Sequence, residues 1–102
     1  MTTRIGFGYD VHAFAPDRAL VLGGVIIPYG RGLSGHSDAD ALIHAVVDAL
    51  LGAAALGDIG SHFPSSDIRW KDQPSTVFLD YTLTLLQQHN WKISNIDATI
   101  VA

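Results

Sequence analysis

The feature that most constrains the fold is a run of apolar residues with helical spacing near the middle of the chain. Between residues 38 and 56 these side chains recur on one helix face: Leu42, Ile43, Val46, Val47, Leu50, Leu51 and Ala54. Ser37 is a favourable N-cap residue, and Asp38 and Asp40 suit the first turn. Gly57 suits the end of the helix. The pattern predicts an amphipathic helix over Asp38–Leu56 that must bury one face.

Short strands and a second helix are predicted elsewhere in the chain. Apolar or alternating runs predict four strands: Arg4–Tyr9, Ala19–Leu22, Val25–Pro28 and Trp91–Ala102. A turn at Gly23-Gly24 joins the middle two as a hairpin. Ser75–His89 repeats the helical pattern, and three segments are predicted as loops: Val11–Arg18, Tyr29–Gly35 and Asp58–Asp72. This order predicts an α+β fold, with an α/β-type mixed sheet that carries its helices on one face.

The length and apolar content predict one small domain that shares surface with other chains. The 102 residues suffice for a single domain over residues 1–102. Hydrophobic residues make up 48% of the chain, and short chains of this kind often associate with identical partners. A strand at the very C-terminus leaves an exposed edge, so we expect the domain to be incomplete at that end.

Charge and composition exclude several classes of protein. Six Lys and Arg residues and a net charge of −4 do not provide the basic surface that nucleic-acid binding needs. The longest apolar tract, residues 45–56, contains Asp48 and Gly52 and is too short to cross a membrane. The absence of cysteine excludes disulfides and Cys-based zinc sites. No signal peptide is visible, and we expect a cytoplasmic protein that binds neither membranes nor nucleic acid.

Two imidazoles and one carboxylate have the spacing of a metal site. Asp10 and His12 lie two residues apart, so an extended chain places them on one face. His44 lies on the predicted helix. Either part alone is ordinary, because Asp-x-His is usually a strand-end turn and a single helical histidine is usually solvated. Together the three form a standard zinc ligand set with a fourth position for water or substrate.

Polar residues around the predicted helix suggest further contacts to the same site. Free N–H groups at a helix N-terminus suit phosphate, and His36 and Ser37 would add donors there. Ser37 could equally serve only as a cap. Asp40 and Asp48 lie one turn to either side of His44, where either could orient the imidazole or remain a surface charge.

Taken together, these motifs resemble the 2-C-methyl-D-erythritol 2,4-cyclodiphosphate synthases, enzymes of the non-mevalonate isoprenoid pathway. The resemblance runs from Arg4 to Ala102 without a visible gap. It is carried by these segments: Arg4-Ile5-Gly6-x-Gly8-x-Asp10-Val11-His12-x-Phe14, Gly23-Gly24-Val25-x-Ile27-Pro28, His36-Ser37-Asp38-Ala39-Asp40-x-x-x-His44, Asp48-Ala49-Leu50-Leu51-Gly52-Ala53, Leu56-Gly57-Asp58-Ile59-Gly60, Phe63-Pro64 and Asn95-x-Asp97-x-Thr99-Ile100. So many matched segments argue against an unrelated zinc phosphohydrolase with the same three ligands.

The resemblance implies a role for each matched site residue. Asp10, His12 and His44 match the zinc ligands, and Asp10 and His12 also lie at the substrate. His36 matches a catalytic residue that helps to stabilise the transition state, beside the substrate-contacting Ser37. Two segments match those that hold or close over the methylerythritol part of the substrate: Asp58, Ile59 and Gly60, then Phe63, Pro64, Ser65, Ser66 and Asp67.

The resemblance also implies the reaction, the cofactors and the assembly. The 2-phosphate of 4-diphosphocytidyl-2-C-methyl-D-erythritol 2-phosphate, a nucleotide diphosphate, attacks the β-phosphate and CMP leaves. Such a lyase reaction needs positioning and charge neutralisation more than a protein nucleophile. One zinc ion per chain is implied, together with a second divalent cation, magnesium or manganese, in the intact enzyme. The family is homotrimeric, with active sites between subunits.

Two departures from the family pattern leave two hypotheses open. Ser65 stands where relatives often carry aspartate. The family's chains are also longer: the cytidine-binding loop begins near Ala102, and a Thr-Thr-x-Glu segment for the second cation follows it. The chain is therefore expected to be the synthase, intact or by complementation. The alternative is a catalytically inactive, truncated fragment that binds zinc and forms trimers.

Overall fold

Two helices of similar length form the centre of the molecule in the computed structural model, which describes residues 2–101. Helix α1 spans Ala41–Ala53 and helix α3 spans Thr76–Gln88. Between them lie the single-turn helix α2 (Ile59–His62) and the 3-10 turn η1 (Ile68–Trp70). None of the described helices is long and apolar enough to cross a membrane.

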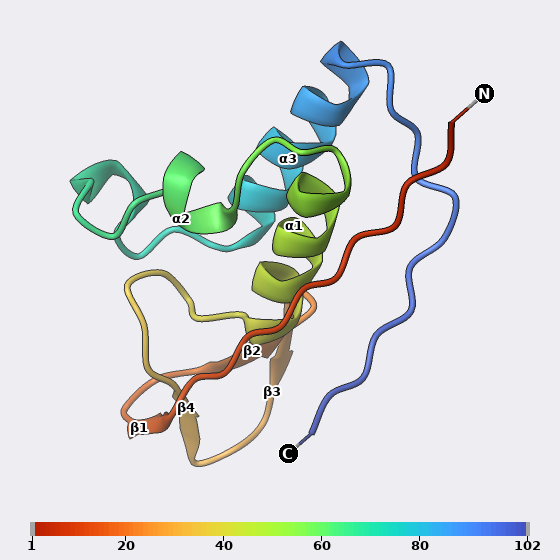
Figure 1. Cartoon of the computed structure of the whole chain (residues 1–102). Helices are drawn as coiled ribbons and strands as arrows, with labels where there is room; N and C mark the ends of the chain where they lie inside the picture. Colours follow the sequence, from red (N-terminus) through yellow and green to blue (C-terminus); the bar gives the residue numbers. More distant parts are fainter. Residues whose placement is uncertain (1, 102) are drawn as a thin grey trace.

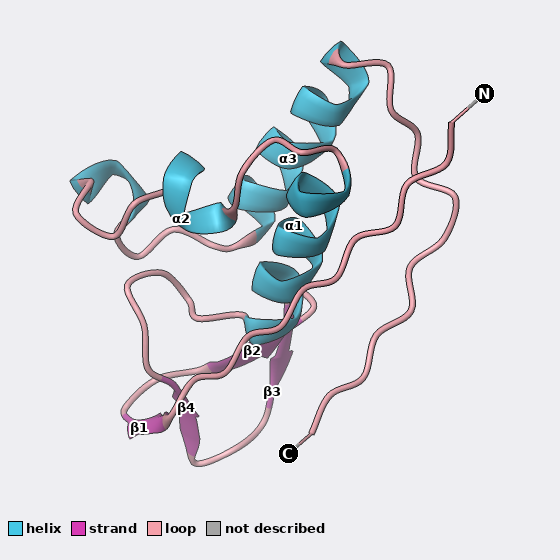
Figure 2. Ribbon diagram, viewed as in Figure 1, coloured by secondary structure: helices cyan, strands magenta, loops and turns pink. Residues whose placement is uncertain are grey.

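Four strands of three residues each form two antiparallel pairs below the helices (Figure 2). β1 (Phe14–Pro16) pairs with β4 (Arg31–Leu33), and β2 (Leu20–Leu22) pairs with β3 (Val25–Ile27). The α+β class is confirmed. The described residues contain two separate pairs, however, so the prediction of one mixed sheet over them is wrong.

The predicted hairpin is confirmed at the Gly23-Gly24 turn. Both glycines have positive φ angles, +63° and +77°, as a two-residue turn of the type that matches strand twist requires. All three predicted loops contain regular elements: Val11–Arg18 contains β1, Tyr29–Gly35 contains β4, and Asp58–Asp72 contains α2 and η1. Three-residue strands with proline or glycine inside them have no readable alternation. They form here by pairing with each other.

The segments predicted as outer strands, Arg4–Tyr9 and Trp91–Ala102, form no strand ladder among the described residues. Both run as extended chain past α1 (Figure 1), and Ala102 itself lies outside the described residues. A strand requires a neighbour to receive its backbone hydrogen bonds, and neither segment finds one in residues 2–101. The first segment instead lies directly on α1.

The main core lies between α1 and α3. Ile43, Val47 and Leu51, spaced four residues apart, are buried on one face of α1 and form one cluster with Phe63 and Phe78. A smaller cluster lies between the strands and the start of α1; its buried members are Leu20, Leu33 and Ala39. The helix predicted at Ser75–His89 is confirmed as α3, with Ser75 and His89 as its cap residues.

Helix α1 starts later than predicted, and its cap is Asp40 rather than Ser37. Ala39 has a φ of +58°, which interrupts the helical path, so the prediction that the helix begins at Asp38 is wrong. The fully buried Asp40 carboxylate accepts the Ile43 N–H at 3.0 Å. It also accepts the N–H groups of Gly23 and Gly24 at 2.9 and 2.7 Å, and thereby joins the β2–β3 turn to α1.

Helix α1 also ends earlier than the predicted Leu56. Ala54 is the cap and Ala55 takes the left-handed conformation, with φ of +56°. The Leu56 N–H then donates to the Leu51 carbonyl at 2.9 Å, and Ala55 N–H to Gly52 at 3.1 Å. This is the Schellman pattern of hydrogen bonds, formed here on alanine instead of glycine.

Replacing Asp40 by alanine is expected to destabilise the fold by about 2–4 kcal/mol. The substitution removes a helix cap and leaves two further turn N–H groups without their acceptor. Urea unfolding measures the change. Asp80→Ala is the matched control, since Asp80 is exposed on α3. An Asp40→Ala variant as stable as the control would contradict this account of the buried carboxylate.

Candidate metal centre

The three predicted ligands come together in space. One ligand atom from each of Asp10, His12 and His44 lies within 4.8 Å of the other two. Asp10 Oδ2 lies 2.7 Å from His12 Nε2 and 3.3 Å from His44 Nδ1. All three side chains are partly buried, with exposed fractions of 24%, 18% and 14%. The arrangement is that of a group that can hold one metal ion.

Glycine near the N-terminus places the first two ligands against α1. A Cβ atom on Gly8 would lie 1.8 Å from the Ala45 carbonyl oxygen, so only glycine permits this approach. Ala45 is the neighbour of His44, and Gly8 precedes Asp10 by two residues. The close contact therefore brings the Asp10 and His12 side chains to the turn of α1 that carries the third ligand.

The backbone around Ser34 fixes the tautomer of His12. His12 Nδ1 lies 2.7 Å from the Ser34 carbonyl oxygen, which can only accept a hydrogen bond. A neutral ring must therefore carry its proton on Nδ1 and present a bare Nε2 to Asp10. A bare nitrogen at 2.7 Å from a carboxylate oxygen needs a proton or a metal ion between the two atoms.

His44 has its outer nitrogen engaged by hydroxyl groups. His44 Nε2 lies 2.8 Å from Ser75 Oγ and 3.3 Å from Ser37 Oγ. The Ser75 hydroxyl donates to the carboxylate of Asp38, which also accepts the Ser75 backbone N–H at 3.0 Å. The other ring nitrogen, Nδ1, faces Asp10.

The surroundings of His44 favour the neutral imidazole. Burial lowers its pKa below the ordinary value, and the opposing effect of the nearby Asp10 carboxylate is smaller. The neighbouring His12 lowers the pKa of His44 further. Because a metal ion binds neutral imidazole, this environment prepares His44 as a ligand.

The hypothesis that Asp40 or Asp48 orients His44 is wrong. Asp40 caps α1 and binds the β2–β3 turn, as described above. Asp48 accepts the Ile59 N–H at 2.7 Å and so connects α1 to α2. The side chain that contacts the His44 ring is instead Ser75, which the sequence analysis did not identify. Ser75 stands at the start of a predicted helix, and that position indicates only a helix cap.

His36 and Ser37 lie in the loop before α1, not at a free helix N-terminus. Because α1 begins at Ala41 and Asp40 caps it, the prediction that Ser37 caps this helix is wrong, while phosphate binding at His36 and Ser37 stays a prediction. Ser37 is buried, and its hydroxyl accepts the Ala39 N–H at 3.2 Å. His36 Nε2 is one of two buried side-chain polar atoms without a hydrogen-bond partner in residues 2–101.

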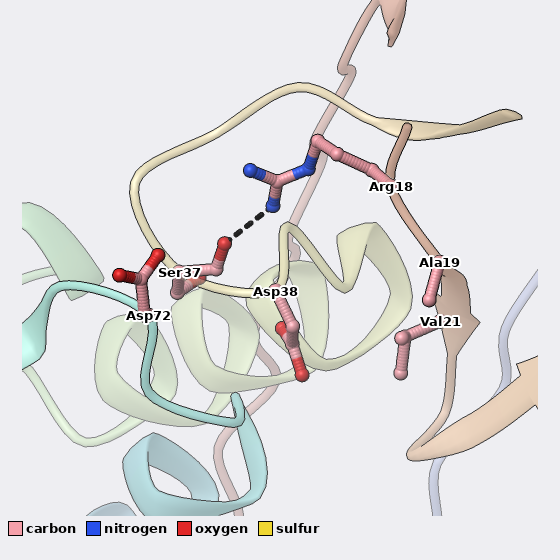
Figure 3. Close-up of a pocket in the computed structure, with 6 residues that line it drawn as sticks. All are labelled: Arg18, Ala19, Val21, Ser37, Asp38 and Asp72. Carbon is pink, nitrogen blue, oxygen red and sulfur yellow. Dashed lines mark hydrogen bonds between the residues drawn. The ribbon is translucent and has the colours of Figure 1, made fainter. Parts of the chain in front are cut away.

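Arg18 holds the backbone of this loop in place. Its guanidinium donates to the Gly35 carbonyl at 3.1 Å and to the Ser37 carbonyl at 2.6 Å. Figure 3 shows Arg18 reaching across to Ser37 above a pocket of about 190 Å³, with Asp38 and Asp72 on its other sides. The loop that carries His36 is thus fixed by contacts from outside α1.

The predicted substrate residues Asp58, Ile59 and Gly60 form the start of α2. Asp58 caps this helix and accepts the Ser61 N–H at 2.8 Å, while the Ser61 hydroxyl accepts from Asp58 N–H at 3.1 Å. The segment is more ordered than the predicted turn, and Asp58 and Gly60 are exposed. Their contact with a substrate stays a prediction.

The predicted closing loop has a buried start and an ion pair at its end. Phe63 lies in the core, where its ring contacts those of Phe78 and Trp70. Asp67 caps η1 and pairs with Arg69 at 2.6 Å, which lowers the pKa of that carboxyl. Substrate contacts in this segment stay predictions at all five residues: Phe63, Pro64, Ser65, Ser66 and Asp67.

A family model matches this fold and site over almost the whole chain. The model of the YgbB family covers residues 3–102. The chain belongs to the YgbB family. The match includes all three residues of the metal centre and the loop that carries His36.

Several relatives of this YgbB family chain are named 2-C-methyl-D-erythritol 2,4-cyclodiphosphate synthase. The Clostridium perfringens protein is 61% identical over 99 residues, which are 97% of this chain and 64% of the relative. The Moorella thermoacetica protein is 60% identical over 97% of this chain and 61% of its own length. The chain thus spans slightly under two thirds of the length of these relatives.

Solved structures of similar proteins agree with the fold of this YgbB family chain. A 2C-methyl-D-erythritol-2,4-cyclodiphosphate synthase in its CDP-bound form superposes with a TM-score of 0.78 at 46% identity, covering 85% of this chain and 58% of that one. IspF of Plasmodium falciparum in complex with CDP gives a TM-score of 0.72 at 38% identity, over 90% and 55% of the two chains.

Replacing His44 by alanine is expected to abolish stoichiometric metal binding. The variant loses one of three ligands, but the side chain is not part of the main apolar cluster, so the fold persists. Purified chains are incubated with zinc, desalted and analysed for metal content. His89→Ala is the matched control, because His89 lies exposed at the other end of α3. Full occupancy in the His44→Ala variant would refute the site.

Proposed function

We propose that this chain acts as a 2-C-methyl-D-erythritol 2,4-cyclodiphosphate synthase. The reaction is the intramolecular attack of the 2-phosphate of 4-diphosphocytidyl-2-C-methyl-D-erythritol 2-phosphate on its β-phosphate, with release of CMP. The observation that carries the proposal is the convergence of Asp10, His12 and His44 in a chain 61% identical to a relative of that name. The CDP complexes of two structural relatives support a cytidine diphosphate substrate.

Zinc is the metal that this ligand set favours. Two imidazole nitrogens and one carboxylate oxygen, with no cysteine in the chain, match the composition of an open zinc site. Bound zinc would supply positive charge to a phosphate oxygen and a template for the reacting groups. The chain's own part is to present one nitrogen of each imidazole through fixed tautomers and to hold both rings partly buried.

The loop before α1 is proposed to contact the reacting phosphates. His36 has a buried Nε2 without a partner in the described residues, an atom that a phosphate oxygen could satisfy. Arg18 fixes the loop backbone, so His36 and Ser37 are held in place before substrate arrives. Two segments are proposed to hold the methylerythritol part: Asp58–Gly60 and residues 63–67, in which Asp58, Gly60, Ser65 and Ser66 are exposed.

The remaining partners are proposed from the family resemblance. A second divalent cation, magnesium or manganese, belongs to the intact enzyme, and the sites lie between the subunits of a homotrimer. Large apolar side chains exposed on the surface support association with other subunits. Phe7 is 84% exposed, Tyr9 73% and Ile26 71%. The proposed location is the cytoplasm.

The second candidate is a catalytically inactive fragment that binds zinc and forms trimers. Asp10, His12 and His44 support metal binding in this candidate equally, because the metal site needs no more than these three side chains. The two functions share the metal site and differ in turnover. CMP release therefore separates them.

His36→Ala is expected to reduce turnover by roughly 10²–10³-fold, the usual cost of losing one preorganised donor to a transition state. The assay measures CMP release by a chain extended with the part of the Clostridium perfringens relative that lies beyond the aligned region. Zinc content should be unchanged, since His36 is outside the ligand set. His89→Ala provides the control. Turnover equal to that of the unsubstituted extended chain would remove His36 from the mechanism.

The 102-residue chain alone is expected to release CMP more slowly than the extended chain at equal zinc loading, by about 100-fold or more, the usual cost of losing even one preorganised group at a transition state. Displacement at phosphorus needs charge neutralised on both the transferred and the leaving groups. Asp10, His12 and His44 provide for one cation only. Equal rates would show that the additional segment has no part in the chemistry.

A further inference from the structure

Ser75 occupies the cap position of α3 without capping it. A serine at an N-cap ordinarily accepts an N–H from the first turn of its own helix. The Ser75 side chain makes no such bond. Its hydroxyl is fully buried and instead lies between the carboxylate of Asp38 and the Nε2 of His44. A locally favourable bond is thus given up for a contact with a residue of the metal centre.

We propose that Ser75, oriented by Asp38, is a positioning residue that fixes the tautomer of His44 for metal binding. The proposal rests on the proposed metal site at Asp10, His12 and His44. The proposal identifies the side chains that hydrogen-bond to His44 on the side of the ring that faces away from the metal.

The donor and acceptor capacities of the groups decide the direction of the relay. A carboxylate can only accept, so Asp38 takes the hydroxyl proton of Ser75. The Ser75 backbone N–H and the Asp40 backbone N–H, each at 3.0 Å, also donate to Asp38 and hold the carboxylate still. The Ser75 oxygen then has only lone pairs to offer to His44.

The His44 ring must therefore donate from Nε2. A hydroxyl whose proton is already engaged accepts the Nε2–H at 2.8 Å, which leaves Nδ1 bare. That nitrogen faces Asp10 Oδ2 at 3.3 Å, on the side of the other ligands. Ser37 Oγ, at 3.3 Å from Nε2, accepts the Ala39 N–H and is the more distant partner. The shorter contact with Ser75 therefore determines which nitrogen of His44 carries the proton.

The two histidine ligands are thus held by different hydrogen-bond partners, which select opposite tautomers. A backbone carbonyl holds His12 with its proton on Nδ1, and the Asp38–Ser75 pair holds His44 with its proton on Nε2. Each bare nitrogen faces the same carboxylate oxygen of Asp10. The relay also joins the loop before α1 to the start of α3, so the metal site depends on how these helices pack.

The test is the zinc affinity of Ser75→Ala, measured by competition with a chromophoric chelator. Loss of a partner behind a metal-bound histidine typically costs about 10- to 100-fold in affinity, and this range is expected here. Asp38→Asn is the second variant, because an amide cannot accept all three donors that the carboxylate accepts. The absorption spectrum of the cobalt-loaded chain, which reports ligand geometry, should change in both variants.

Thr82→Val is the matched control, since Thr82 is another fully buried hydroxyl on α3 that donates only to its own helix. Its zinc affinity should match that of the unsubstituted chain.

The double variant Asp38→Asn/Ser75→Ala should lose little more affinity than Ser75→Ala alone, because Asp38 acts through Ser75. Unchanged affinity in Ser75→Ala, additive losses, or an equal loss in Thr82→Val would overturn the proposal. If Ser75→Ala does not fold, unchanged zinc affinity in Asp38→Asn would overturn the proposal. Failure of the unsubstituted chain to bind zinc would instead refute the metal site.

Discussion

The buried carboxylate of Asp40 is the contact on which the arrangement of the other parts depends. It accepts three backbone N–H groups, one from the first turn of α1 and two from the β2–β3 turn. An unpaired carboxylate could not remain fully buried, so strands and helix are fixed relative to each other by one side chain. Asp38, two residues earlier, binds the start of α3 in the same manner. A single short loop thereby organises strands, both long helices and the histidine ligand on α1.

The metal centre collects groups that repel one another without a cation. Two ring nitrogens, each made bare by a partner on its far side, converge on one oxygen of Asp10. Burial disfavours protonation of His44, so a proton is a poor substitute for a metal ion there. The fold supplies the required rigidity through Gly8, which lets the N-terminal segment lie on α1. Preorganisation of this kind keeps the ligands in place before the ion binds.

The sequence predicted those parts of the structure that depend on local pattern or on ligand chemistry. The helical repeat located α1 and α3, the glycine pair located the hairpin, and the residue types of Asp10, His12 and His44 located a group that can hold a metal ion. Parts that depend on distant partners were missed. The strands β1 and β4 exist only through each other, and the start of α1 is set by a turn that lies 16 or 17 residues earlier in sequence. Ser75 reaches His44 across 31 residues, a contact that no spacing rule reveals.

The central claim is that His12 and His44 bind one metal ion through different ring nitrogens. Long-range ¹H–¹⁵N NMR of the zinc-loaded chain, labelled at its histidines, reads the state of every ring nitrogen directly. The account predicts that His12 is metal-bound at Nε2 with its proton on Nδ1, and that His44 is metal-bound at Nδ1 with its proton on Nε2. Binding of both rings through the same type of nitrogen, or a ring left unbound at full zinc occupancy, would contradict it.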